Sequence, residues 1–392
     1  MDKIVVLDFG SQYSHLICRR IREFSVYAEL VPFDISYEEL QKLNPKGVIF
    51  SGGPSSVYSS DAPVPENKIY EMGLPLLGIC YGHQLIVNKF GGKVKRANKE
   101  YGSSLLTIDS DKDLLNDVGE SVRAWMSHGD EAEEIPPGFQ IIGHTEGAKA
   151  AAIASEEKSV YGIQFHPEVV HTEQGTEILK NFVLKVCKAE QGWSMEGFID
   201  TAVEKISKIE GNVLCGVSGG IDSTVVALLI HKAIGDRLKC VFVNNGLLRL
   251  NEEIEVEDMF KNNFNVNFTS VDASEKFLGK LKGIEDPEKK RMIIGEEFVH
   301  VFTEFAEKSG PFKWLAQGTL YPDVIESGVS KGPAAVIKSH HNVGGLPDWL
   351  NLEILEPVRE LYKDEVREIA KILQVPEKLF MRHPFPGPGL AV

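Results

Sequence analysis

Short segments of the chain carry side chains of the kinds that act in nucleophilic catalysis. Cys80 stands between two glycines in Gly78-Ile79-Cys80-Tyr81-Gly82, directly after an apolar run at 75–79. A nucleophile flanked by glycines in this way is typical of a sharp turn between a strand and a helix, which exposes the reactive atom near the helix N-terminus. That location favours the thiolate form of a cysteine. The spacing therefore predicts that Cys80 is a nucleophile.

A base and an orienting group for this thiol occur together in Phe165-His166-Pro167-Glu168. Proline restricts the residue before it to an extended conformation, so the side chains of His166 and Glu168 are expected to project to the same side of the chain. The imidazole of His166 would then serve as the base, and the carboxylate of Glu168 would hold the imidazole in place.

An oxyanion hole is predicted from backbone N–H groups near the same thiol. Ser51-Gly52-Gly53-Pro54 ends another apolar run, and its two glycines leave their N–H groups unhindered by side chains. The N–H group of Tyr81 follows the nucleophile directly. These donors could stabilise the negative oxygen that forms when a carbonyl is attacked. A simple turn is the alternative interpretation of the glycine pair.

Taken together, these segments resemble the class I glutamine amidotransferases over residues 1–188. The resemblance implies that glutamine is hydrolysed through a thioester on Cys80, with His166 as base and Glu168 as orienting group, and that ammonia is released. It also implies a set of residues that bind glutamine, namely Gln84, Ser127, His128 and Asp130. The remaining cysteines lie in apolar or helical patterns without paired spacing, which argues against a disulfide framework and a zinc site.

A second kind of chemistry is indicated by residues 218–224, Ser-Gly-Gly-Ile-Asp-Ser-Thr, which lie between an apolar run at 213–217 and an apolar-periodic run at 225–234. Adjacent glycines permit a tight turn, and the free N–H groups at the start of the following helix favour a phosphate. Asp222 stands where the common phosphate-binding loop has lysine. An acidic residue there suggests Mg²⁺ bridging to phosphate oxygens. A glycine turn capped by Asp222 is the alternative interpretation.

This segment resembles the PP-loop ATP pyrophosphatases, which adenylylate a substrate oxygen and release pyrophosphate. The resemblance implies ATP as co-substrate and Mg²⁺ held by Asp222. The residues expected to contact ATP are Ser218, Gly219, Gly220, Ile221, Asp222, Ser223, Thr224 and Val243.

The elements that must position these residues alternate between strands and helices. Strands are expected at 3–8, 27–31, 46–51, 75–79, 213–217, 239–243 and 266–271, and helices at 12–24, from Met195 onward and at 289–308. This alternation predicts an α/β fold with two doubly wound, mostly parallel sheet domains in tandem, and ligands in such sheets bind beyond the carboxyl ends of the strands. We expect a glutamine amidotransferase domain at 1–188 and an ATP pyrophosphatase domain at 194–385. Residues 317–327 and 338–347 lack periodicity and are expected to be loops.

The composition and net charge of the chain disfavour nucleic acid and membranes as partners. The 392 residues are 43% hydrophobic with a net charge of −15, which disfavours nucleic acid as a partner because phosphate backbones require clustered Lys and Arg. No apolar stretch is long enough to span a bilayer. A strand-like run follows Met1-Asp2-Lys3 directly, so no signal peptide is predicted. We therefore expect a cytoplasmic protein that acts on small molecules.

The chain as a whole is similar to the glutamine-hydrolysing GMP synthetase family, on the segments 245–249, 290–295, 318–327, 338–347 and 382–389. The resemblance implies a ligase of purine biosynthesis, in which xanthosine monophosphate (XMP) is adenylylated at O2 by Mg-ATP and ammonia then displaces AMP to give GMP. It implies that Arg291 contacts the nucleotide substrate and that Lys338 lies on the pyrophosphate side.

Two departures from that family are expected to matter. Asn244 stands where the family usually has Asp, and residues 386–392 correspond to the start of a third domain that carries the family's homodimer contacts. The alternatives are a glutaminase or ATP-binding module that needs a partner chain, another PP-loop enzyme such as a tRNA thiolase or NAD synthetase, and a non-catalytic scaffold. The acidic charge disfavours the tRNA enzyme.

Overall fold

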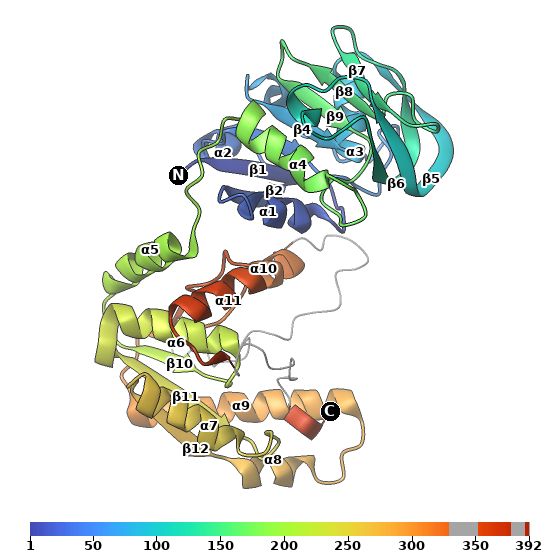
Figure 1. Cartoon of the computed structure of the whole chain (residues 1–392). Coiled ribbons are helices and arrows are strands. Elements are labelled where there is room, and N and C mark those ends of the chain that lie inside the picture. The colour runs from blue at the N-terminus through green and yellow to red at the C-terminus, as the bar shows by residue number, and fades with distance from the viewer. Residues whose placement is uncertain (329–351, 378–388, 392) are drawn as a thin grey trace. The chain divides into compact units, whose positions relative to one another are not determined.

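The computed structural model describes residues 1–328, 352–377 and 389–391. The chain divides into two compact units, Met1–Ser194 and Met195–Val392 (Figure 1). Each unit consists of a sheet with helices packed against it, so the predicted α/β class is confirmed. Within the described ranges, no helix is both long enough and apolar enough to cross a membrane.

The first unit is built on a nine-stranded sheet in the order β2-β1-β3-β4-β9-β8-β7-β5-β6. Its strands are β1 (Lys3–Asp8), β2 (Tyr27–Pro32), β3 (Gly47–Phe50), β4 (Leu76–Ile79), β5 (Lys93–Ile108), β6 (Ser121–Glu134), β7 (Gln140–His144), β8 (Ala152–Ser155) and β9 (Val160–Ile163). Its α-helices are α1 (Ser14–Arg22), α2 (Tyr37–Lys42), α3 (Tyr81–Lys89) and α4 (Gly175–Lys180). The strands expected in this half are confirmed as β1 to β4, and the helix expected at 12–24 as α1.

Parallel and antiparallel strands occupy different parts of this sheet. Strands β2, β1, β3, β4 and β9 are parallel. The others pair antiparallel, mainly through the long β5–β6 hairpin. That antiparallel extension was not predicted. A signal for it exists in β6, where buried and more exposed residues alternate, as expected for a strand with one face on the core.

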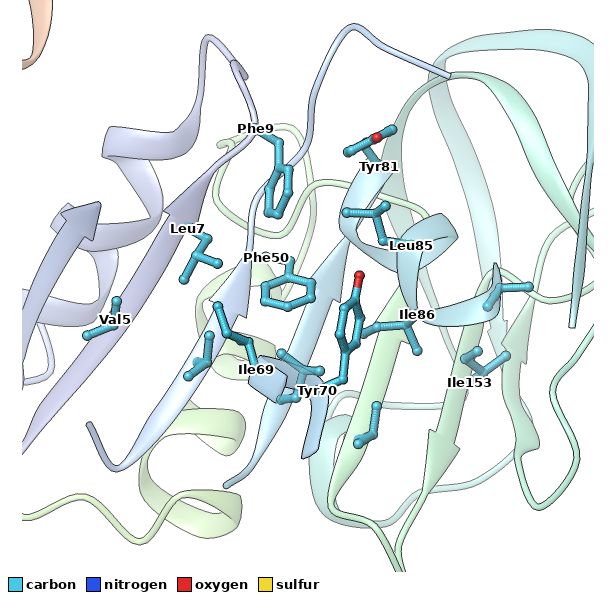
Figure 2. Packing of buried hydrophobic residues seen from close by; sticks show 14 of the residues in the cluster. Val5, Leu7, Phe9, Phe50, Ile69, Tyr70, Tyr81, Leu85, Ile86 and Ile153 are labelled. Atoms are coloured by element: carbon cyan, nitrogen blue, oxygen red, sulfur yellow. The ribbon is translucent and has the colours of Figure 1, made fainter. Parts of the chain in front are cut away.

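A hydrophobic core lies between the parallel strands and helix α3 (Figure 2). Phe50 on β3 packs edge-on against Phe9 and Tyr70, with ring centroids 5.4 and 5.2 Å away. Helix α3 can approach this layer closely because Gly82 has no side chain, and a Cβ there would lie 2.4 Å from the carbonyl oxygen of Phe50. This packing fixes the start of α3 against the ends of the strands.

The second unit is built on a five-stranded, all-parallel sheet in the order β12-β11-β10-β13-β14. Its strands are β10 (Val213–Gly216), β11 (Leu238–Asn244), β12 (Phe268–Asp272), β13 (Trp314–Ala316) and β14 (Glu353–Leu355). Its α-helices are α5 (Met195–Ser207), α6 (Ile221–Ile234), α7 (Glu252–Asp258), α8 (Ser274–Leu281), α9 (Pro287–Ser309), α10 (Tyr321–Gly328) and α11 (Lys363–Ile372). The strands and helices expected in this half are confirmed as β10 to β12, α5, α6 and α9.

One expectation for the second unit was wrong. Residues 317–327 were expected to form a loop, but helix α10 begins at Tyr321. The carboxylate of Asp323 accepts a hydrogen bond from the N–H group of Leu320 at 3.0 Å, which stabilises the start of the helix. Pro322 is tolerated because the first turn of a helix needs no N–H donor there. The second expected loop, 338–347, lies outside the described residues.

Candidate active sites

The nucleophile candidate stands at a strained turn. Cys80 connects β4 to α3 with φ 53° and ψ −103°, a backbone conformation that is rare for a residue with a side chain. Both flanking glycines are required, since a Cβ at Gly78 would lie 2.4 Å from the carbonyl oxygen of Gly82. The N–H group of Cys80 donates to the carbonyl oxygen of Ile163 at 2.8 Å. The turn is therefore tied to the end of the neighbouring strand β9.

The residues predicted to be the base and its orienting group follow that neighbouring strand. His166 Nδ1 lies 2.8 Å from Glu168 Oε1, and the two residues are 3% and 1% exposed. Cys80 lies near the same imidazole, since a Cβ at Gly52 would lie 3.0 Å from His166 Cε1 and 3.6 Å from Cys80 Cβ. Thr172 fixes the segment, since its hydroxyl donates to the carbonyl oxygen of His166 at 2.5 Å and accepts from the N–H group of Trp125 at 3.0 Å. The structure thus brings Cys80, His166 and Glu168 together.

Charge within this triad favours a proton on His166. Burial acts to lower the pKa of His166, but the charge of Glu168, the hydrogen bond to Glu168 and the nearby Cys80 outweigh it and raise the pKa to about 11. His166 would therefore be an imidazolium at neutral pH. An imidazolium beside a nucleophile has a proton to give to the leaving group.

We expect Glu168→Gln to move the alkaline limb of the glutaminase pH profile to lower pH. Glu168 raises the pKa of His166, so its removal lets the imidazolium lose its proton at a lower pH. The value of kcat/KM should fall by about 10- to 100-fold, as for loss of a charge-assisted hydrogen bond. The profile of kcat/KM against pH checks this. An unchanged alkaline limb would contradict the role given to Glu168.

Gly52 lines the space beside the triad. A Cβ at Gly52 would lie 3.0 Å from His166 Cε1 and 3.6 Å from Cys80 Cβ, and one at Gly53 would lie 2.6 Å from the carbonyl oxygen of Phe9. A side chain is therefore excluded at Gly53, and at Gly52 it would press on the imidazole of His166. Tyr81 is the first residue of α3. These placements agree with the predicted oxyanion hole, which stays a prediction.

The predicted glutamine-binding residues lie on α3 and β6, near Cys80. Gln84 Nε2 donates to the carbonyl oxygen of Asp130 at 2.9 Å, and His128 Nδ1 lies 3.1 Å from the same oxygen. The carbonyl oxygen of Ser127 lies 3.5 Å from Cys80 Sγ. Their role in binding glutamine stays a prediction.

Two residues that support this group were missed from the sequence. Ser56 donates its hydroxyl to Asp130 Oδ2 at 2.5 Å, and Glu100 Oε2 lies 3.2 Å from His128 Nε2. Neither residue has a local pattern that distinguishes it, because both contacts depend on how β5, β6 and the loop after β3 meet in the fold.

The predicted phosphate loop connects β10, the central strand of the second sheet, to α6. The chain runs from β10 to β11 and β12 on one side and then to β13 on the other, so the strand order reverses next to this loop, where ligands bind in open α/β sheets. Gly219 has φ +72°. The N–H group of Ser218 donates to Ser223 Oγ at 3.2 Å, and the hydroxyl of Thr224 donates to the carbonyl oxygen of Gly220 at 2.8 Å. The loop is therefore held in shape by its own hydroxyl groups.

Asp222 has a cationic partner that the sequence analysis did not single out. Lys363 Nζ lies 2.6 Å from both carboxylate oxygens of Asp222. Lys363 is the first residue of α11, where a positive charge is disfavoured by the helix dipole. A lysine at this unfavourable position is a sequence signal for an ion pair outside its own helix.

In the described part of the chain, no three His, Cys, Asp or Glu side chains cluster as metal ligands. A single carboxylate fits Mg²⁺ that is held mainly through substrate phosphates.

The remaining predicted residues are less informative. Val243 is 8% exposed and packs in a core cluster with Phe277. Arg291 lies on α9, its side chain 54% exposed and 3.0 Å from Glu288. Lys338 lies outside the described residues.

Asn244 donates from Nδ2 to Glu253 Oε2 at 2.6 Å. An aspartate at this position would place a second carboxylate against Glu253, so the amide suits its neighbour.

Each of the two units matches a known protein family. Residues 5–186 match the family model for glutamine amidotransferase class-I, and residues 193–293 match the model for NAD synthase. The relative from Brachyspira hyodysenteriae named GMP synthase [glutamine-hydrolyzing] is 53% identical, over 100% of this chain and 77% of its own length. The relative of the same name from Caldicellulosiruptor saccharolyticus is 54% identical, over 99% of this chain and 76% of its own length. The chain belongs to the family of glutamine-hydrolysing GMP synthases.

Proposed function

We propose that residues 1–188 hydrolyse glutamine and that residues 194–385 activate XMP with ATP, so that the chain makes GMP from XMP and the ammonia released. The observation that carries this proposal is the placement of Cys80 beside the His166–Glu168 pair, on the same chain as a phosphate loop at a central parallel strand. Family membership makes the chain an ATP-dependent carbon–nitrogen ligase with glutamine as amino donor.

In the first half-reaction, the thiolate of Cys80 attacks the amide carbon of glutamine. The oxygen that becomes negative is stabilised by N–H groups of the turn at Gly52 and of Tyr81. His166 gives its proton to the leaving nitrogen, which departs as ammonia and leaves a thioester. His166 then takes a proton from water, whose oxygen attacks the thioester carbon, and glutamate leaves as the thiolate re-forms.

In the second half-reaction, the phosphates of ATP lie against the free N–H groups at the start of α6. Mg²⁺ held by Asp222 would neutralise charge on the phosphate oxygens. The O2 atom of XMP attacks the α-phosphorus of ATP and pyrophosphate leaves. Ammonia then attacks C2 of the adenylylated base, and AMP leaves with O2.

We expect Lys363→Met to lower ammonia-dependent GMP formation by about 100-fold, because a positive charge beside the developing pyrophosphate is lost. Basal glutamine hydrolysis should not change, since Lys363 belongs to the second unit. Steady-state assays with ammonium and with glutamine alone would check both statements. Lys371→Met, an exposed lysine on the same helix, is the matched control. Equal rates in the two variants would contradict the assignment.

The proposed function is tested by incubating the chain with XMP, Mg-ATP and ammonium and measuring every product. One AMP and one pyrophosphate should form for each GMP. Formation of ADP and phosphate instead would overturn the adenylylation step. A requirement for Mg²⁺ and a cytoplasmic location are further proposals, which family membership supports. Chelation of Mg²⁺ should stop GMP formation.

A further inference from the structure

Gln164 occupies a position beside Cys80 that the mechanism above does not use. It directly follows β9, whose last residue pairs with the last residue of β4. Its N–H group donates to the carbonyl oxygen of Ala151 at 2.8 Å, and the residue is 1% exposed. Its side-chain Nε2 donates to Cys80 Sγ at 3.8 Å. Two adjacent parallel strands thus deliver an amide donor to the nucleophilic sulfur.

The groups around the sulfur differ in which state of Cys80 they suit. The carbonyl oxygen of Ser127, 3.5 Å from Sγ, can only accept a hydrogen bond and therefore suits the neutral thiol. Gln164 Nε2 can only donate and therefore suits the thiolate. When Cys80 loses its proton, the contact with Ser127 is lost as a hydrogen bond while the contact with Gln164 becomes charge-assisted.

Packing alone does not account for a glutamine at this position. Gln164 Oε1 is buried and has no hydrogen-bond partner. A buried acceptor without a partner is destabilising, and an apolar side chain of similar length would avoid that cost. The side chain is therefore best explained by its Nε2 group, which is the end that contacts Cys80.

We propose that Gln164 is a further catalytic residue of the glutaminase site, which donates its side-chain N–H to the thiolate of Cys80 and aligns the sulfur for attack. The proposal rests on the assignment of Cys80 as the nucleophile. The donor is preorganised, because backbone hydrogen bonds hold both residues in place. The N–H group of Gln164 donates to the carbonyl oxygen of Ala151, and the N–H group of Cys80 donates to that of Ile163.

The test compares Gln164→Met with the intact chain. Methionine keeps the length of the side chain but has no donor. The alkylation of Cys80 by iodoacetamide, followed by peptide mass spectrometry from pH 5 to pH 10, reports the thiolate directly. We expect the rise of the alkylation rate to move to higher pH. The glutaminase kcat/KM should fall by about tenfold with little change in KM, and ammonia-dependent GMP formation should not change.

Two further variants separate a donor from a packing role. Gln164→Glu has no donor when ionised and brings a like charge to the thiolate, so its alkylation should be slower than that of the methionine variant. Gln140→Met makes the same chemical change at an exposed position on β7 and should behave as the unchanged chain. An unchanged alkylation profile in Gln164→Met would overturn the proposal, whatever its glutaminase rate. Because alkylation needs no turnover, this failure is distinct from a failure of the proposed function.

Discussion

Replacing Cys80 with alanine should abolish GMP formation from glutamine and leave GMP formation from ammonium unchanged. Removal of a catalytic nucleophile costs on the order of 10⁴-fold or more in rate. Ammonium bypasses the first site, so the second half-reaction should proceed at the original rate. Parallel assays with glutamine and with ammonium measure both activities.

The matched control for this result is Cys187→Ala. Burial raises the pKa of the Cys187 thiol well above its ordinary value, so this thiol stays neutral and unreactive. The control should keep glutamine-dependent activity. If Cys80→Ala lost GMP formation from glutamine and from ammonium equally, the assignment of glutamine hydrolysis to the first unit and of amination to the second would be wrong.

The second large effect is expected for Asp222→Asn, which should lower GMP formation from both nitrogen sources by about 10³-fold. Its carboxylate is the charge that we propose to hold Mg²⁺ at the phosphate loop, and Lys363 binds both of its oxygens. Folding should change little, because the pair is partly exposed, at 31% and 43% for Asp222 and Lys363. Such pairs contribute about 0–1 kcal/mol.

Glutamine hydrolysis measured alone should be unaffected by Asp222→Asn, and this shows whether the first unit is intact. Asp236→Asn, at an exposed position beyond the end of α6, is the matched control and should keep full activity. An Asp222→Asn chain that made GMP from ammonium at the original rate would exclude the assigned role.

The features that the sequence revealed are local ones. The glycines around Cys80 specify a sharp turn within five residues, and the spacing of His166 and Glu168 across a proline leads directly to their 2.8 Å contact. The parallel strands β1 to β4 were recognisable because strands buried on both faces are nearly continuous apolar runs.

The features that were missed depend on contacts between distant segments. Gln164 and Cys80 are 84 residues apart, and Lys363 and Asp222 are 141 apart. Such pairs are set by strand order, which hydrophobic periodicity does not specify. The β5–β6 hairpin was missed although β6 alternates, because β5 is irregular, with a shift of its pairing register between Arg96 and Glu100.

The most direct test of the account is to follow nitrogen from glutamine into GMP. The chain would be given XMP, Mg-ATP and glutamine labelled with ¹⁵N in its side-chain amide, and the product would be weighed by mass spectrometry. GMP should carry one ¹⁵N in its exocyclic amino group, because each glutamine hydrolysed releases one labelled ammonia. GMP without label, formed while glutamine is consumed, would contradict the claim that the first site supplies the second.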